Sequence, residues 1–456
     1  MTQTVTLCAD DRSDALRLPP SVWETLGATP GQHALLSFGG MCRFTLLERD
    51  ARLPMGEICL PRRAIRQMHM PDYPVYELAV VHGELRVGPV IGLLVSHRAQ
   101  QLTPGRLERL RRNMWAYPRL HGAIIAFSLD GVDRAGRLIA GYCYNPSEGR
   151  FVPGVFPYPS VIYRTVGLSR QWKDHFLAAV EGGFFNYPYF NKWEMYRWFA
   201  DDPAVGPYLP FTARYESPQQ AEAVLRRCGA LYIKPVFGLG GHGVVRARLE
   251  GTLVRFDYRE ENVNRRDAIP LGEPAQAWMT ARFSGRQLLL QQALDLLQIG
   301  GRMADFRCVM QKDQAGRWVC PAVIGRRGRR GSVVSNISSG GSAFLAEELP
   351  RLPVPLPPDE TRRLPNRLRN FAFEVCRAVD RAGLRCGTLG LDVGVDATGA
   401  LWLIEINNRD PASSIALDVG DRELFRRIKA GPLFYAKGLA GFPTPTRPEG
   451  LERVEK

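Results

Sequence analysis

The pattern of apolar and polar positions changes twice along the chain and predicts three regions of different architecture. Residues 1–85 contain short apolar runs separated by turn residues, which is typical of a small β-rich module. Residues 16–23 resemble residues 58–65 in outline, because in both a short strand ends at Leu-Pro before a helical turn. The similarity indicates either an internal duplication within a compact barrel or a coincidence.

From residue 86 the pattern becomes that of an α/β unit, which we place at residues 86–185. Continuous apolar runs at residues 87–95 and 121–128 predict buried strands, and residues 104–117 predict a helix between them. Strands that alternate with helices predict a mostly parallel sheet. Neither of these first two regions contains a cluster of catalytic residue types.

The third region, residues 186–430, contains the candidate chemistry, and residues 431–456 are expected to form a C-terminal tail. A helix is expected after Asn191, since asparagine is a good N-cap. Lys192 then lies in the first helical turn, where a cation is unfavourable against the helix dipole unless an anion offsets it. This unusual placement makes Lys192 a candidate for anion binding.

A short apolar strand at residues 230–235 ends in Lys234 and leads through a glycine-rich loop into a second β-branched strand. Glycines let the backbone wrap closely around phosphates, and a lysine at the strand end adds a charge for the same groups. The loop contains Gly238, Gly240, Gly241, His242 and Gly243. A strand on either side excludes a Walker A loop and a Rossmann turn, since both lead into a helix. A glycine hairpin without function is the alternative.

Residues 389–395 and 401–406 are apolar and β-branched and are joined by a turn signal at residues 396–399, which predicts a β-hairpin. Alternation places Glu405 and Asn407 on one side of their strand, and pairing across the turn can bring Asp392 to the same end. Two carboxylates and an amide are oxygen ligands of the kind that Mg²⁺ selects. The alternative is an ordinary hairpin of a soluble protein, which commonly carries such acids.

Two further strands carry weaker signals. The apolar strand that begins at residue 288 turns polar at its end, and such a strand can offer backbone groups to an adenine edge and an acid to a ribose. Its end consists of Gln291, Gln292, Ala293, Leu294 and Asp295. Arg307 follows Asp305 by two residues, so both lie on one strand face. Arg307 is a candidate for binding a γ-phosphoryl group or a carboxylate bidentately, and a structural ion pair is the alternative.

Bulk composition limits the remaining possibilities. The chain has 456 residues with 45% hydrophobic and 10% aromatic residues, typical of a folded protein of two or three domains. No apolar run approaches a bilayer span and no signal peptide is recognised, so we expect a cytoplasmic protein without membrane contact. Nine scattered cysteines without a Cys-x-x-Cys pair argue against a zinc site and a disulfide framework. We expect them to be reduced and to fill the core.

The formal net charge of +14 favours anionic partners. A nucleic-acid binder is the weakest candidate, because basic and aromatic residues do not interleave in any recognised module. The densest basic segment, residues 326–330, is either a solvated loop or an anion-binding one. A loop of small residues at positions 335–342 follows it and either receives an anion or serves as a linker.

Taken in order, these segments resemble the ATP-grasp superfamily, specifically the YheC/YheD-type endospore-coat-associated proteins. The resemblance rests on residues 190–194, Lys234 with the glycine loop, residues 291–292, 305–307, 335–341, and 391–407. It implies an α+β ATP-grasp fold, an α/β fold in the broad sense, with a glycine-loop lobe at residues 188–290 and a metal and substrate lobe at residues 291–430.

The resemblance also implies roles. Lys192 and Lys234 would bind the ATP phosphates, the glycine loop would close over them, and the segment from Gln291 to Leu294 would flank the adenine. Asp392, Glu405 and Asn407 would bind Mg²⁺, and Arg307 would stabilise the acyl-phosphate oxygens. The candidates for the acceptor side are Arg327, Ser335, Asn336, Gly340, Gly341 and Arg409. The sequence after Asn407 departs from the family's usual small residue and Pro-Gly, which leaves the acceptor open.

The implied activity is that of an ATP- and Mg²⁺-dependent carboxylate–amine ligase that forms an amide through an acyl phosphate. The basic surface favours an acidic substrate, for example a peptide, a protein tail or a coat protein. The alternative is a spore-coat-associated scaffold that binds nucleotide with little or no turnover.

Overall fold

The computed structural model describes residues 2–81, 83–237, 243–261, 263–329, 340–408 and 414–442. The chain divides into two compact units, and each is described by itself. Unit 1 consists of Met1–Tyr187, Gln311–Arg317 and Arg426–Lys456, and unit 2 consists of Pro188–Met310 and Trp318–Phe425. Among the helices of the described residues, none is both long and apolar enough to cross a bilayer.

Unit 1 begins with a closed barrel whose strand order is β1-β5-β2-β4-β3-β7-β6. Its strands alternate inward apolar and outward polar residues, so that one apolar core fills the interior. Each of the two similar sequence segments is a strand followed by a short helix, β2 with α1 and β5 with α2. The elements are β1 (Thr2–Ala9), β2 (Leu16–Leu18), α1 (Pro20–Leu26), β3 (His33–Phe38), β4 (Met41–Arg49), β5 (Glu57–Leu60), α2 (Arg62–Gln67), β6 (Tyr76–Val81) and β7 (Glu84–Gly88).

The second sheet of unit 1 has the order β11-β10-β9-β8-β12-β13. Strands β9, β8, β12 and β13 are parallel, as the alternation of strands and helices predicts. Strands β10 and β11 are the exceptions in this mostly parallel sheet, and they pair antiparallel because residues 123–157 form two consecutive hairpins without a helix. The elements are β8 (Val90–Ser96), α3 (Pro104–Arg111), α4 (Tyr117–Leu120), β9 (Ala123–Asp133), β10 (Leu138–Asn145), β11 (Arg150–Pro157), β12 (Val161–Arg164), α5 (Arg170–Ala179) and β13 (Phe184–Phe185).

The C-terminal segment contributes a helix to this unit. Helix α11 (Arg422–Leu439) continues past residue 431, where we placed the start of the tail. Its apolar residues Leu433 and Ala436 join the core of the second sheet. The end of the described chain is therefore packed structure as far as residue 442.

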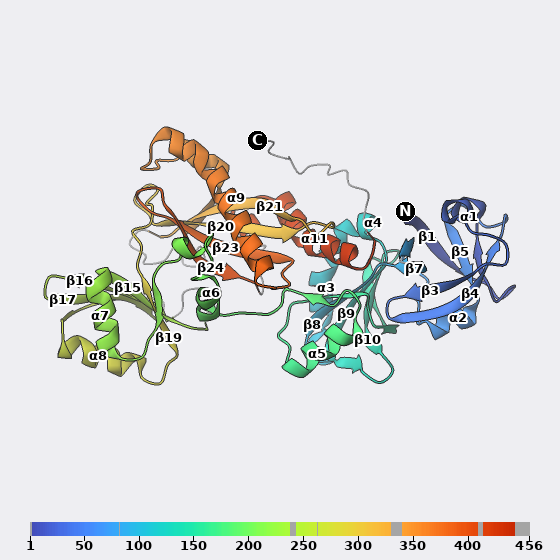
Figure 1. Ribbon diagram of the computed structural model, residues 1–456, viewed down its shortest axis with the longest axis horizontal. Helices are drawn as coiled ribbons and strands as arrows, with labels where there is room; N and C mark the ends of the chain where they lie inside the picture. The colour runs from blue at the N-terminus through green and yellow to red at the C-terminus, as the bar shows by residue number, and fades with distance from the viewer. Residues whose placement is uncertain are drawn as a thin grey trace. The chain divides into compact units, whose positions relative to one another are not determined.

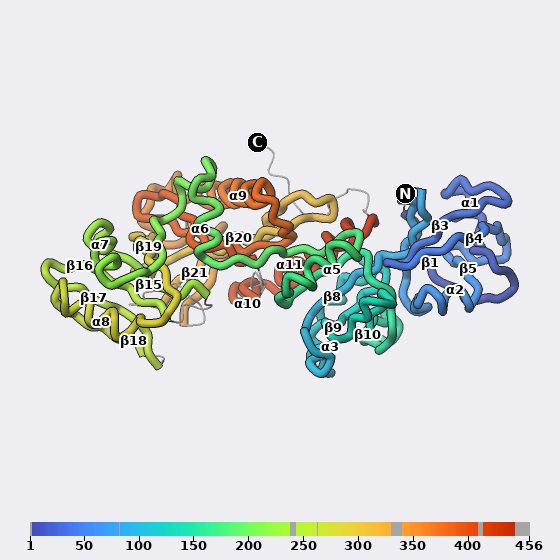
Figure 2. Tube along the Cα trace, turned by 60° about the horizontal axis from the view of Figure 1, so that its bottom comes forward, coloured from blue at the N-terminus to red at the C-terminus, as the bar shows by residue number. Residues whose placement is uncertain are grey.

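Unit 2 contains two sheets, and the first is an antiparallel sheet in the order β14-β19-β15-β16-β17-β18. Helices α7 and α8 cover one of its faces (Figures 1 and 2). We call this part the helix-covered lobe. Its elements are β14 (Thr212–Arg214), α7 (Pro218–Cys228), β15 (Ala230–Pro235), β16 (Val245–Glu250), β17 (Leu253–Glu260), β18 (Val263–Pro270), α8 (Glu273–Phe283) and β19 (Leu288–Gln292).

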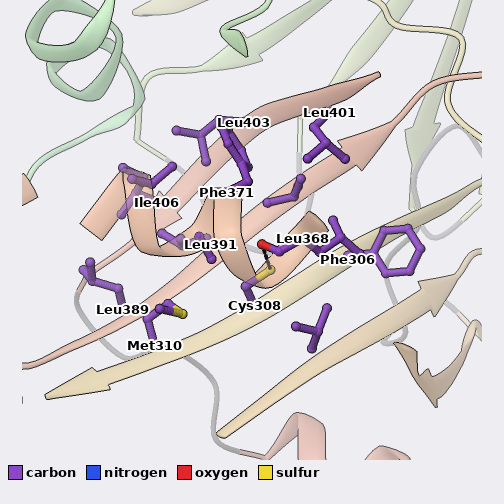
Figure 3. Packing of buried hydrophobic residues seen from close by; sticks show 14 of the residues in the cluster. Phe306, Cys308, Met310, Leu368, Phe371, Leu389, Leu391, Leu401, Leu403 and Ile406 are labelled. Atoms are coloured by element: carbon purple, nitrogen blue, oxygen red, sulfur yellow. Dashed lines mark hydrogen bonds between the residues drawn. The ribbon is translucent and has the colours of Figure 1, made fainter. Parts of the chain in front are cut away.

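The second sheet of unit 2 has the order β22-β21-β20-β23-β24. One face packs on the long helix α9, and Phe306, Cys308, Leu391 and Leu403 lie in this core with Leu368 of the helix (Figure 3). The opposite face carries polar side chains. The elements are α6 (Lys192–Phe199), β20 (Ala304–Lys312), β21 (Trp318–Arg327), β22 (Ser342–Leu345), α9 (Pro358–Arg381), β23 (Thr388–Val395), β24 (Leu401–Asn407) and α10 (Ile415–Asp418).

Candidate functional site

The predicted hairpin of β23 and β24 is present, and a β-bulge decides which of its side chains leave the core. Leu401 and Leu403 of β24 are buried in the core, so strict alternation would send residue 405 to the same face. The register shifts after Asp392, which pairs with Glu405 while Val393 pairs with Leu403. The extra residue on β24 turns Glu405 to the polar face, as bulges characteristically do.

The bulge places all three candidate metal ligands on one face. Asp392 lies directly opposite Glu405, and Asn407 lies opposite Gly390 on the same side. The amide nitrogen of Asn407 lies 3.3 Å from Asp392 Oδ2, which directs the amide oxygen away from Asp392. Two carboxylates and one amide side chain thus lie on one face at the end of the hairpin, and these residue types fit a hard divalent cation.

Asp392 is buried and held by two arginines from neighbouring strands. Arg307 of β20 donates to it bidentately, with 2.5 Å from Nε to Oδ1 and 3.1 Å from Nη2 to Oδ2. Arg326 of β21 lies 3.1 Å from Asp392 Oδ1 and also binds Asp305 bidentately at 2.7 and 2.6 Å. Burial acts to raise the pKa of Asp392, but the two guanidinium groups more than offset it, so this pKa lies below its ordinary value.

Lys192 reaches the same site from the start of helix α6. Asn191 is the N-cap, as predicted, and it forms a capping box with Glu194. This arrangement fixes Lys192 at the first position of the helix, and its Nζ lies 3.0 Å from Glu405 Oε1. A carboxylate therefore offsets the unfavourable helix dipole in this structure.

Lys234, at the end of β15, is buried and binds a neutral partner. Its Nζ donates to Gln291 Oε1 at 2.7 Å, and Gln291 Nε2 donates to Thr212 Oγ1 at 3.1 Å. Among the ion pairs of the described residues, none includes Lys234. Burial lowers the pKa of Lys234 to about 8, with Glu405 opposing and Lys192 reinforcing the shift. The site thus contains a buried cation that faces an amide.

The segment predicted to flank an adenine is partly occupied by internal hydrogen bonds. The side chain of Gln291 positions Lys234, the backbone N–H of Gln292 donates to Phe211 O at 2.9 Å, and that of Ala293 donates to Ala230 O at 3.1 Å. Leu294 is half-buried and Asp295 is exposed. Asp295 therefore has the solvent access that a ribose contact requires.

The acceptor candidates separate in the structure. Arg327 lies on the opposite face of β21 from Arg326, with its guanidinium carbon 5.3 Å from the centre of the Phe344 ring. Gly340 has a positive φ of 88°, and Gly341 follows it directly before the strand β22. The other predicted loop residues lie outside the described residues, namely Gly238, Gly240, Gly241, His242, Ser335, Asn336 and Arg409. Gly243 is described, with a positive φ of 71°.

Two residues of the site were missed by sequence reasoning. Arg326 binds both Asp305 and Asp392, and Thr212 fixes the amide of Gln291. The expectation of a loop over residues 326–330, either solvated or anion-binding, is wrong for Arg326 and Arg327, because β21 extends through Arg327 and buries Arg326. The alternation of faces in β21 would have separated Arg326 from Arg327, but the apolar run before them hides that alternation.

A known protein family matches the part of the chain that carries this site. The model of the YheC/D-like ATP-grasp family matches residues 182–439. The chain is 24% identical to the endospore coat-associated protein YheD of Bacillus subtilis over 377 residues, which cover 79% of this chain and 78% of that protein. It is also 24% identical to YheC of the same organism over 232 residues, 49% of this chain and 61% of that protein.

Solved structures with an overall likeness include a D-alanyl-alanine synthetase A from Vibrio cholerae, at 12% identity and a TM-score of 0.43. This likeness covers 76% of this chain and 99% of the synthetase. Another is the ATP-grasp ligase PsnB with a minimal precursor, at 14% identity and a TM-score of 0.42, covering 76% of this chain and 99% of PsnB. The family match covers more than half of the chain, and the chain belongs to the YheC/D-like ATP-grasp family.

Proposed function

We propose that the protein is an ATP- and Mg²⁺-dependent carboxylate–amine ligase that forms an amide bond through an acyl phosphate. The observation that carries the proposal is the juxtaposition of buried Lys234 with a face that gathers Asp392, Glu405 and Asn407. Within the described part of the chain, the cationic head of Lys234 has no carboxylate partner, which suits a phosphate ligand. The three oxygen ligands suit the cation that accompanies nucleotide phosphates.

The proposed metal residues are Asp392, Glu405 and Asn407. A bound Mg²⁺ neutralises charge on the phosphoryl oxygens as a Lewis acid. Asp392 enters this role ionised, since its pKa is depressed by Arg307 and Arg326. Asn407 points its amide nitrogen at Asp392, so its side-chain amide would rotate to offer its oxygen to the cation that Asp392 binds.

The proposed phosphate residues are Lys192 and Lys234. Lys192 is positioned by the capping box of α6, and it would donate to phosphate oxygens instead of to Glu405. Lys234 is held in place by the Gln291–Thr212 pair, so its charge requires little rearrangement. Both lysines place a positive charge where negative charge develops in phosphoryl transfer. Such electrostatic stabilisation is the main contribution that this kind of site makes to the rate.

Arg307 is the proposed stabiliser of the acyl-phosphate oxygens. Its guanidinium has five N–H donors, and Asp392 uses the two that the structure pairs. The remaining donors can therefore bind an oxyanion. The attacking carboxylate and the amine belong to the substrates, so the reaction needs no nucleophilic side chain from the protein.

An acidic peptide or protein tail is the proposed substrate class. The net charge of +14 favours it. A second candidate function is a coat-associated scaffold that binds nucleotide without turnover. The names of YheD and YheC as endospore coat-associated proteins favour that candidate.

The two functions differ in turnover. ADP release is measured with Mg-ATP, a set of acidic peptides and a set of amines, and the product is identified by its mass. The ligase proposal expects ADP release that depends on both substrates and is lost in Glu405→Gln. Glu347→Gln is the matched control, since it removes another ion pair, with Arg369, in the same unit and should leave turnover unchanged. Binding of Mg-ADP without turnover for any pair would favour the scaffold.

A further inference from the structure

The uncovered face of the helix-covered lobe presents an ordered set of basic side chains. Leu231, Ile233 and Ala247 point to helices α7 and α8, so their neighbours along β15 and β16 point to the other face. Arg246 lies opposite Tyr232 of β15 and Asp257 of β17, and Arg248 lies opposite Arg255 of β17. We call Arg246, Arg248, Arg255 and Arg266 the arginine surface.

The four arginines of this surface differ in their partners. Arg255 binds Glu250 at 2.6 Å and Asp257 at 3.1 Å, and Arg266 binds Asp257 at 2.8 Å. Neither Arg246 nor Arg248 takes part in an ion pair among the described residues. Arg246 also has a buried Nε without a hydrogen-bond partner. Of the four arginines, the two without a described ion pair therefore both lie on β16.

These two arginines adjoin the proposed ligase site. Tyr232, which faces Arg246, is two residues from Lys234 on the same face of β15. Arg246 and Arg248 are both half-buried, and holding a guanidinium group partly out of water without an ion-pair partner is unfavourable. An anionic ligand on β16 would remove that cost and would lie beside the site.

We propose that Arg246 and Arg248 bind the carboxylates of an extended acidic polypeptide segment that delivers its reacting group to the site around Lys234. This inference rests on the proposed ligase function and specifies its substrate class. The two arginines are two residues apart on a strand, about 7 Å, which equals the repeat of side chains on one face of an extended peptide. Bidentate pairing with carboxylates is the interaction that guanidinium groups make best.

A polypeptide suits this surface better than a nucleic acid does. Single-stranded nucleic acids bind where aromatic side chains stack on bases beside basic residues. Among the described residues on this face of β15–β18, the aromatic one is Tyr232, which is not exposed. Asp257 also lies between Arg246 and Arg266, which interrupts a continuous track for phosphates.

The test measures the binding of a fluorescent deca-glutamate peptide to the full chain by anisotropy, without nucleotide. The expected result is salt-sensitive binding that the double variant Arg246→Ala/Arg248→Ala weakens about tenfold, since exposed charge pairs contribute up to about fivefold each. The matched control compares Arg248→Glu with Arg265→Glu. Arg265 lies on β18 opposite Tyr258, on the helix-covered side of the same sheet, and its variant should bind like the wild type.

Three outcomes would overturn the proposal: no deca-glutamate binding at millimolar protein, equal losses in Arg248→Glu and Arg265→Glu, or tighter binding of a deoxythymidine decamer than of the peptide. Calorimetric titration of the same samples with Mg-ADP separates this inference from the ligase proposal. Intact Mg-ADP binding without peptide binding would refute the arginine surface alone. Absence of Mg-ADP binding would instead refute the proposed function.

Discussion

The pKa of Lys234 predicts that nucleotide affinity falls as the pH rises above 8. Burial lowers this pKa from 10.5 to about 8, mainly because the charged form is poorly solvated next to the neutral Gln291. A nucleotide phosphate would contact the protonated form. Binding therefore requires a proton on Lys234 that the free protein increasingly lacks above pH 8.

The magnitude follows from simple titration. At pH 9, one unit above its pKa, only about a tenth of the Lys234 side chains are protonated, so the affinity for Mg-ADP should be about tenfold lower than at pH 7. Each further unit should cost about another 1.4 kcal/mol until the bound state also loses its proton. Between pH 8 and the pH at which Lys234 loses its proton in the bound state, binding of Mg-ADP should be accompanied by proton uptake.

Isothermal titration with Mg-ADP at pH 7.5, 8.5 and 9.5 measures this dependence, and two buffers with different ionisation heats report the proton uptake. Lys234→Arg is the control, because arginine keeps its charge throughout this range and should give a nearly flat profile. Equal wild-type affinities across the three pH values, or zero proton uptake at pH 8.5, would refute the assignment of Lys234 to the phosphates.

The same shift has a consequence for folding with a definite sign. Because the pKa of Lys234 is lower in the folded chain than in the unfolded chain, the unfolded chain binds more protons between pH 8 and 10.5. This lysine therefore contributes a free energy of unfolding that increases with pH in that window, by roughly 3 kcal/mol in total. Urea titrations of wild type and Lys234→Met should converge as the pH rises.

Three further predictions concern the neighbours of Lys234. Glu405→Gln should abolish the Mg²⁺ dependence of ADP binding in calorimetry while changing the free energy of unfolding by about 1 kcal/mol or less, since its pair with Lys192 is partly exposed; retained Mg²⁺ dependence would exclude it as a ligand. Arg326→Gln should lower the free energy of unfolding by about 3 kcal/mol in urea, because it removes the arginine that binds buried Asp305 bidentately and also contacts buried Asp392, whereas Arg327→Gln should cost about 1 kcal/mol. Similar costs for both arginines would contradict the assignment of their faces. Asn191→Ala should cost about 1 kcal/mol through the lost cap of helix α6, and Asn191→Gly clearly less, as urea titration will measure.

The sequence predicts those parts of the site that depend on local rules. The cap of helix α6, the strand that ends at Lys234 and the hairpin of β23 and β24 follow from short-range preferences, and each is confirmed. The alternation rule correctly placed Glu405 and Asn407 on one side. It could not assign that side to the polar face, because the bulge after Asp392 is set by pairing across the sheet rather than by the strand itself.

Contacts between distant segments could not be predicted from the sequence. Cys8 and Cys59 are widely separated in the chain, yet they lie directly opposite each other on β1 and β5. Their sulfur atoms and a carboxylate oxygen of Glu57 lie within 4.8 Å of one another, a grouping that the cysteine spacing had argued against. Most cysteines fill the core as expected, but Cys42 is exposed. Such neighbours depend on strand order, which a single sequence specifies only weakly.

The ion pairs of the site connect the proposed metal ligands with the proposed phosphate and acyl-phosphate ligands. Asp392 is paired with Arg307, and Glu405 is paired with Lys192. In each pair the acid is a proposed ligand of Mg²⁺, and the base is a proposed ligand of a phosphoryl group. Binding Mg²⁺ and nucleotide together would therefore exchange partners without leaving either charge unpaired, whereas binding either ligand alone would leave one member uncompensated. The arrangement therefore favours joint binding of Mg²⁺ and nucleotide. Lys234 differs, because among the described residues it has no acidic partner to give up, so the nucleotide alone would neutralise its charge.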